Sequence, residues 1–254
     1  MGDGDRTLGR VIDDLEGIVS GARADYSEIG IFPAMYRSVT IAIDNGINHG
    51  HFDDPKMIER LAVVFADRYL DAHRTWSIGG VPTESWKVAF DAATDGKRRS
   101  AAQHLLAGMN AHINLDLGIA AWEVSPDDPA CLHDDFNRVN DVLFDRLDAN
   151  QEALASVSRR MTMLDRLAGR LDERAMGMAI AKARDRAWDL TESLAAARAD
   201  ADTLMTDRDH ATAAIGSAIL GNTLAIRIAS SFVARTEGRT VVDVIDAFVA
   251  SAPA

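Results

Sequence analysis

The sequence predicts an all-α protein, a single-domain helical bundle of about eight to ten helices. Ala, Leu, Asp and Arg abound among the 254 residues, while runs of β-branched or aromatic residues are scarce, which favours helix over strand. Apolar residues recur at the three- and four-residue spacing of amphipathic helices. Hydrophobic residues make up 47% and charged residues 26%, which is typical of a globular chain. No repeat or long linker divides the chain, so we expect one domain over residues 1–254.

Helix-start signals place the helices of the first half. Asp53 or Asp54 can cap a helix that has Pro55 in its first turn, where the missing N–H of proline is harmless. Thr7 and Thr83 can cap two further helices. Between these starts, Gly- and Pro-containing turns interrupt the periodic pattern. The expected helices cover residues 8–24, 31–46, 55–73, 84–93 and 97–123.

The second half is expected to contain a helix from Asp134 or Asp135 to about Ala149, with further helical sequence to about residue 167. Beyond it, apolar residues follow a period of 3.5, and such a seam needs a partner helix beside it. The seam consists of Met176, Ile180, Ala183, Ala187, Leu190, Leu194, Ala197, Ala201 and Leu204. Residues 207–235 are the expected partner, in a long antiparallel helix pair. We therefore divide the domain into motif-bearing helices (1–170) and a C-terminal helix pair with a terminal helix from Thr240 (171–254).

The formal net charge of -12 excludes some classes of partner. An acidic surface repels phosphate backbones and anionic lipids, so we expect neither nucleic acid nor membrane as a partner. The sequence contains no stretch of about 18 apolar residues, so we expect no membrane span. Cys131 is the single cysteine, which excludes an intramolecular disulfide and a Cys-rich zinc site. The acidic start of the chain does not resemble a signal peptide, and we expect a cytoplasmic protein.

Polar residues interrupt apolar sequence most clearly between residues 108 and 121. This segment is apolar except for Asn110, His112, Asn114 and Asp116. His112 and Asp116 are four residues apart, so they share one face of a helix and their side chains can meet. Burying such groups costs free energy unless they are paired, which makes the segment the leading candidate for a site.

Three interpretations of the His112–Asp116 pair remain open. The first is a core histidine hydrogen-bonded to a carboxylate, with a purely structural role. In the second, Asp116 orients and charges His112 for general acid/base catalysis in a pocket. In the third, both residues are ligands of a divalent metal, and Asp135 or Asp67 supplies a further ligand.

Other polar side chains could complete the site. Asp67 is a candidate third catalytic residue, whereas we expect Arg68 and Asp71 on the same helix to form a surface ion pair. Trp188 lies four residues from Arg184, and the two form either a cation–π pair on the surface, which we favour, or a pocket wall. The candidate substrate-binding residues are Tyr36, Arg37, Tyr69, Asn110, Asn140 and Trp188.

Four segments carry a resemblance to a known family: residues 32–40, 65–72, 110–117 and 135–140. They resemble a family of helical proteins of unknown function that is frequent in actinomycetes. The resemblance covers residues 30–150 well and the C-terminal seam more loosely. The string Asn-Ala-His-Ile-Asn-x-Asp-Leu, starting at Asn110, is its most specific element. The resemblance implies a shared origin and pocket, with Asn110, His112 and Asp116 as site residues, and an association with specialised metabolism.

These observations yield three functional hypotheses. The first is a small-molecule enzyme without an organic cofactor, in which His112 moves a proton during a cyclisation, condensation, isomerisation or elimination in a pocket between helices. The second is a metal-dependent hydrolase or oxygenase that uses His112 and Asp116 as ligands of a divalent ion. The third is a non-catalytic binding or assembly module, in which the seam of residues 176–204 pairs with another chain, for example in a homodimer.

Overall fold

The computed structural model describes residues 6–143, 171–221 and 240–253, with the side chains of residues 171–179 excepted. Every regular element in these ranges is helical, which confirms the predicted all-α single-domain bundle. Within the same ranges, no helix combines the length and the apolar character needed to cross a membrane. The expected helical sequence between residues 144 and 170 lies outside the described residues.

The first three helices confirm the predicted starts. They are α1 (Leu8–Ala24), α2 (Ile31–Asn48) and α3 (Pro55–Ser77), with a short 3₁₀ turn, η1 (Glu28–Gly30), before α2. Asp54 caps α3 by accepting a hydrogen bond from the backbone N–H of Met57 at 3.0 Å, with Pro55 as the first helical residue. By contrast, Thr7 flanks α1 without a side-chain cap. The apolar stripe of α1 is buried as its spacing predicts.

The predicted helix 97–123 begins later than expected and contains an irregularity. It comprises α5 (Ala101–Ala111), a π-helical turn η2 (His112–Asp116) and α6 (Leu117–Val124), preceded by the separate helix α4 (Glu84–Thr94). Ser100 and Gln103 form a capping box that fixes the start of α5. After α6 come a 3₁₀ turn, η3 (Pro129–Leu132), and helical residues 133–143.

The C-terminal seam differs from its prediction. Instead of running through Leu204, it is broken between α9 (Leu171–Ala196) and α10 (Ala201–Ile219) by the 3₁₀ turn η4 (Arg198–Asp200). Arg198 anchors this turn to the loop after α6 through the backbone carbonyl of Pro126 and the carboxylate of Asp127. The helix propensity of the Ala-rich sequence therefore does not carry the helix through this turn.

The partner of the seam also differs from the expected segment 207–235, of which residues 222–235 lie outside the described ranges. The seam residues of α9 pack against α6, whereas α10 packs mainly against α4 and α5. Gly118 of α6 allows this approach, because a Cβ there would clash with the backbone oxygen of Ala187. The seam therefore meets an internal helix of the same chain.

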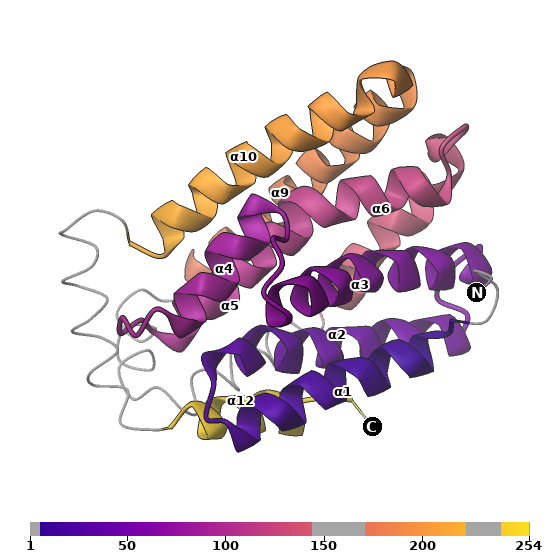
Figure 1. Ribbon diagram of the computed structural model, residues 1–254. Coiled ribbons are helices and arrows are strands. Elements are labelled where there is room, and N and C mark those ends of the chain that lie inside the picture. The colour runs from indigo at the N-terminus through magenta and orange to yellow at the C-terminus, as the bar shows by residue number, and fades with distance from the viewer. Residues whose placement is uncertain (1–5, 144–170, 222–239, 254) are drawn as a thin grey trace.

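The terminal helix α12 (Val241–Ala250) closes the other side of the bundle. It begins next to Thr240, as predicted, with the Thr240 side chain as its cap, and it packs against α1 and α2. In Figure 1, α1, α2 and α12 lie along one side of the molecule, α9 and α10 lie along the opposite side, and α3 to α6 lie between them. The polar segment 110–116 therefore runs through the centre of the bundle.

Candidate functional site

The π-helical turn carries the candidate pair His112 and Asp116. The backbone N–H of Leu117 donates to the carbonyl of His112, an i→i+5 bond that defines a π turn. Such turns are rare and occur frequently at functional sites. Nδ1 of His112 lies 3.1 Å from Oδ2 of Asp116, and only 3% of His112 and 1% of Asp116 is exposed. The pair expected from the sequence therefore forms, deep in the bundle.

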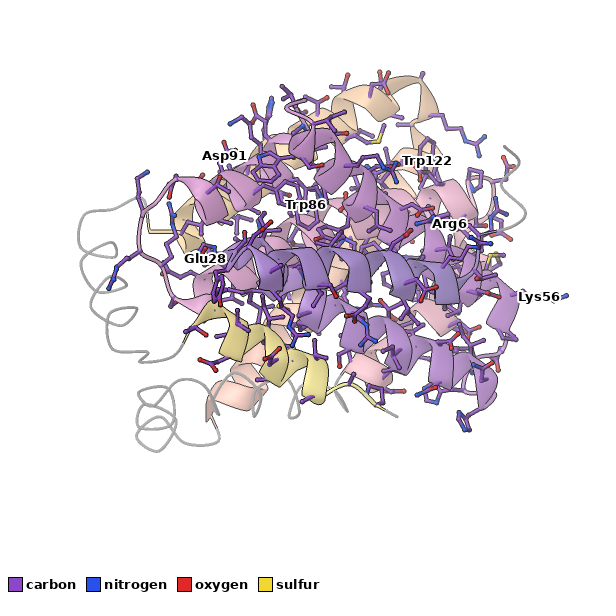
Figure 2. All side chains as sticks on the ribbon, turned by 60° about the horizontal axis from the view of Figure 1, so that its bottom comes forward. Arg6, Glu28, Lys56, Trp86, Asp91 and Trp122 are labelled. Carbon is purple, nitrogen blue, oxygen red and sulfur yellow. The ribbon has the colours of Figure 1, made fainter. Side chains whose placement is uncertain are left out.

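Two residues from other helices hold the Asp116 carboxylate. The indole N–H of Trp86, which lies in the interior of the bundle (Figure 2), donates to Oδ2 at 2.7 Å. Nε–H of Arg68 donates to Oδ1 at 3.3 Å. These donors and the guanidinium charge offset the cost of burying a carboxylate. Because an ionised carboxylate only accepts hydrogen bonds, Nδ1 of His112 carries the proton, which leaves a lone pair on Nε2 of the neutral ring.

Arg68 does not form the surface pair with Asp71 that the sequence suggested. Asp71 is paired instead with Arg74 at 2.6 Å, on the exposed side of α3. Arg68 reaches inward to Asp116 and also donates to Glu123 at 3.0 Å. Partial burial raises the pKa of Glu123, against the opposing effect of Arg68. Arg68 thus links the buried dyad to a carboxylate near the surface.

Five aromatic rings surround the imidazole of His112. The closest is Phe65, which stacks on it with a centroid distance of 3.6 Å and an interplanar angle of 7°. Tyr36 presents an edge-to-face contact at 4.5 Å. We call the set the aromatic cluster; it consists of Phe32, Tyr36, Phe65, Tyr69 and Trp86. Four of these rings are buried, and Phe65 is partly exposed. The imidazole therefore lies in apolar surroundings, stacked on the one partly exposed ring of the cluster.

Two buried polar atoms of this region have no hydrogen-bond partner within the described ranges: Nε2 of His112 and the hydroxyl of Tyr69. The two rings belong to the same cluster, with centroids 6.3 Å apart. Buried polar groups in native proteins are nearly always satisfied, so each exception calls for a water, a ligand or a functional role. Nε2 of His112 is a hydrogen-bond acceptor, and the hydroxyl of Tyr69 is a hydrogen-bond donor.

Burial determines the protonation of the three titratable rings. It lowers the pKa of His112 below its ordinary value, although the Asp116 carboxylate acts in the opposite direction. The imidazole is therefore neutral at pH 7, with its lone pair available. Burial raises the pKa values of Tyr36 and Tyr69, so both phenols stay protonated. The arrangement can accept a proton at Nε2 and stabilise the resulting imidazolium through Asp116.

Asp67 and Arg37, two of the predicted site residues, form ion pairs with α1 and the segment before it. Asp67 pairs with Nε of Arg6 at 2.5 Å, and partial burial raises its pKa against the effect of that arginine. Nε of Arg37 lies 2.9 Å from a carboxylate oxygen of Glu16. Neither residue has a described contact with His112. These two pairs tie α2 and α3 to the N-terminal region.

Asn110 makes contacts that connect helices rather than facing His112. Its amide donates to the carbonyl of Thr212 in α10 at 2.9 Å and accepts from Asn114 at 3.1 Å. Asn140 is partly buried within the helical residues 133–143, and no described contact places it beside His112.

Trp188 and Arg184 do not form the surface pair that we expected. Both are buried. The guanidinium of Arg184 lies over the ring of Phe136, 4.3 Å from its centroid. Trp188 packs against His133 and Phe136 and donates to Glu192 at 3.1 Å. The two side chains thus fasten α9 to the segment after the proline-containing loop.

Asp135, the further ligand of the metal hypothesis, faces the N-terminus of α3. It accepts hydrogen bonds from the backbone N–H groups of Asp53 and Asp54 at 2.9 and 2.7 Å, and it pairs with Arg138 at 2.7 Å. Throughout the part of the chain that the structure describes, no group of three or more His, Cys, Asp or Glu side chains is placed to hold a metal ion.

The sequence did not indicate the roles of Trp86, Phe65 and Phe32. Trp86 lies 30 residues from Asp116, and nothing in its local sequence marks it as polar or catalytic. Phe65 and Phe32 lie in two of the segments that carried the family resemblance, which is the one available signal for them.

Comparisons with known proteins agree with the resemblance at the family level. The family model of DUF5995, described as a family of unknown function, matches residues 8–222. No curated protein and no solved structure matches the chain. The relationship to a family of unknown function is therefore confirmed, while its frequency in actinomycetes and its motif string stay predictions.

Proposed function

Since the chain belongs to DUF5995, a family whose description names no activity, we propose a function from the site itself: a small-molecule enzyme that uses His112 as a general base. The observation that carries the proposal is the lone pair on Nε2 of His112, which is buried and has no partner within the described ranges. In a purely structural histidine, we would expect both ring nitrogens to be hydrogen-bonded. The π turn at the same residues supports the proposal.

The residues around His112 have distinct roles in this proposal. His112 is the catalytic residue, because Nε2 would contact the reacting atom. Asp116 is a positioning residue that fixes the tautomer and stabilises the imidazolium. Trp86 and Arg68 hold Asp116 in place by their hydrogen bonds. A substrate proton removed at Nε2 returns at another atom, which gives an isomerisation, cyclisation, condensation or elimination without an organic cofactor.

Access to His112 requires a movement, because the imidazole is nearly sealed from solvent. Phe65 is the partly exposed ring of the aromatic cluster and covers one face of the imidazole. We propose that rotation of Phe65 admits the substrate. A role in specialised metabolism also belongs to this proposal, on the basis of the family resemblance alone.

The proposal is tested by incubating the protein with an extract of small metabolites and following substrate loss by mass spectrometry. The wild type is expected to convert at least one compound, while His112→Gln converts it at least a hundredfold more slowly. His49→Gln is the matched control, because His49 lies exposed in a loop. Far-UV circular dichroism must show equal helix content for all three proteins. Equal conversion by wild type and His112→Gln, or no conversion by either, contradicts the proposed function.

A further inference from the structure

The hydroxyl of Tyr69 supplies the site with a second reactive group. Tyr69 is 1% exposed, and its oxygen has no hydrogen-bond partner among the described residues. Its ring lies in the aromatic cluster with His112. A base and a buried O–H donor in one apolar site are the two groups that proton abstraction next to a carbonyl requires: one takes the C–H proton and the other stabilises the oxygen.

The charges of the site restrict the substrate. Within the described part of the chain, Arg68 is the cation that contacts the dyad, and it is already paired with both Asp116 and Glu123. His112 is neutral, and the surrounding aromatic cluster is apolar. An anionic substrate would bury its charge beside Asp116 without a free cationic partner, at a large cost in free energy. The site therefore favours an uncharged molecule with apolar surface next to its reactive group.

We propose that the substrate is an uncharged, largely apolar carbonyl compound, which His112 and Tyr69 together convert to its enol or enolate. This inference rests on the proposed function. Nε2 of His112 takes the α-proton, and the C–H electron pair becomes the new carbon–carbon double bond. The carbonyl π pair moves to oxygen, where the O–H of Tyr69 donates a hydrogen bond. Return of a proton to carbon completes the cycle with no oxidant or reductant.

The test measures hydrogen–deuterium exchange at the methyl group of acetophenone in D₂O by proton NMR. The wild type is expected to accelerate exchange over buffer, and His112→Gln is expected to return it to the buffer rate. Tyr69→Phe keeps the ring but lacks the donor, and we expect at least a tenfold loss. The matched control is Tyr26→Phe, at a tyrosine that is 69% exposed, which should behave as wild type. The anionic analogue 4-acetylbenzoate should show no acceleration.

The two experiments together distinguish a failure of this inference from a failure of the proposed function. Acceleration that depends on both His112 and Tyr69 supports it. No acceleration by wild type, an unchanged rate in Tyr69→Phe, or equal acceleration of 4-acetylbenzoate overturns it. If the metabolite experiment, run also with Tyr69→Phe, finds turnover that needs His112 but not Tyr69, the general-base function stands and the enolisation is wrong. If no turnover depends on His112, both are wrong.

Discussion

Replacement of Asp116 by Asn tests the hydrogen-bond network of the dyad. Among the described residues, Oδ2 of Asp116 accepts from two donors, His112 and Trp86, whereas Oδ1 accepts from Arg68 alone. The amide oxygen of the introduced asparagine is therefore expected at the Oδ2 position, since two hydrogen bonds are kept there. The amide NH₂ then faces the N–H of Arg68, so two donors meet and the charge opposite the guanidinium is lost.

The expected loss of stability follows from these contacts. A hydrogen bond to a charged group contributes about 1.5–3 kcal/mol, and removing one partner of a buried ion pair costs about 3–5 kcal/mol. Arg68 keeps Glu123 as a partner, so we expect the lower end, about 3 kcal/mol. The matched control is Asp71→Asn. The side chains of Asp71 and its partner Arg74 are each 66% exposed, and this change should alter stability by less than about 0.5 kcal/mol.

Urea denaturation at pH 7 measures both free energies of unfolding, and ¹⁵N NMR of the imidazole reports the tautomer. The Asp116→Asn variant should keep the proton on Nδ1 of His112, because the amide oxygen still accepts it. Its imidazole should also become harder to protonate, since the nearby negative charge is gone. If Asp116→Asn lowers the free energy of unfolding by less than about 1 kcal/mol, no more than Asp71→Asn does, the assigned network is wrong. A proton on Nε2 in the wild type would contradict the assigned base.

Three further predictions concern packing, capping and pH. Gly118→Ala should lower stability by about 2 kcal/mol, because the new Cβ would meet the backbone of α9. The matched control is Gly17→Ala at an exposed helix position, which should raise stability by up to about 1 kcal/mol. Equal urea midpoints for the two variants would contradict this. Asp209→Ala should lower the free energy of unfolding by about 1–2 kcal/mol, because the Asp209 carboxylate accepts hydrogen bonds from the first two backbone N–H groups of α4. Unchanged hydrogen exchange of these two amides would refute it. Burial lowers the pKa of His104 to about 4, so the unfolded chain binds its proton first as pH falls below about 6.5. Stability should then drop by about 2 kcal/mol between about pH 7 and 4.5, and His104→Gln should lack that part of the drop; parallel pH profiles would contradict it.

Local sequence signals predicted most of the helices and, within the site, the contact between His112 and Asp116. Asp54 with Pro55 marks the start of α3, because a cap and its helix are neighbours in the chain. The His112–Asp116 contact was predictable for the same reason, since a four-residue spacing brings two side chains together on one helix. Tyr36 and Tyr69 were expected near the pair, and the structure places both rings around His112.

Contacts between distant segments were not predictable from one sequence. Arg68 lies 48 residues from Asp116, and a closer acidic residue on its own helix gave it a plausible but wrong partner. The seam of α9 showed which face is apolar without showing which helix covers it, and α6 proved to be that helix. The apolar periodicity of the sequence also continues across the turn at Arg198, where α9 has ended and the Arg198 side chain contacts Asp127.

The most direct test of the general base is the reaction of its lone pair with a small electrophile. The unprotonated imidazole nitrogen attacks diethyl pyrocarbonate and becomes carbethoxylated, and mass spectrometry of peptides locates the modified histidines. We expect His112 to react more slowly than exposed His49 but far faster than the protein unfolds, and faster still in Phe65→Ala. If His112 stays unmodified for as long as the protein remains folded, no small molecule reaches Nε2, and a solely structural role for the dyad is the correct interpretation.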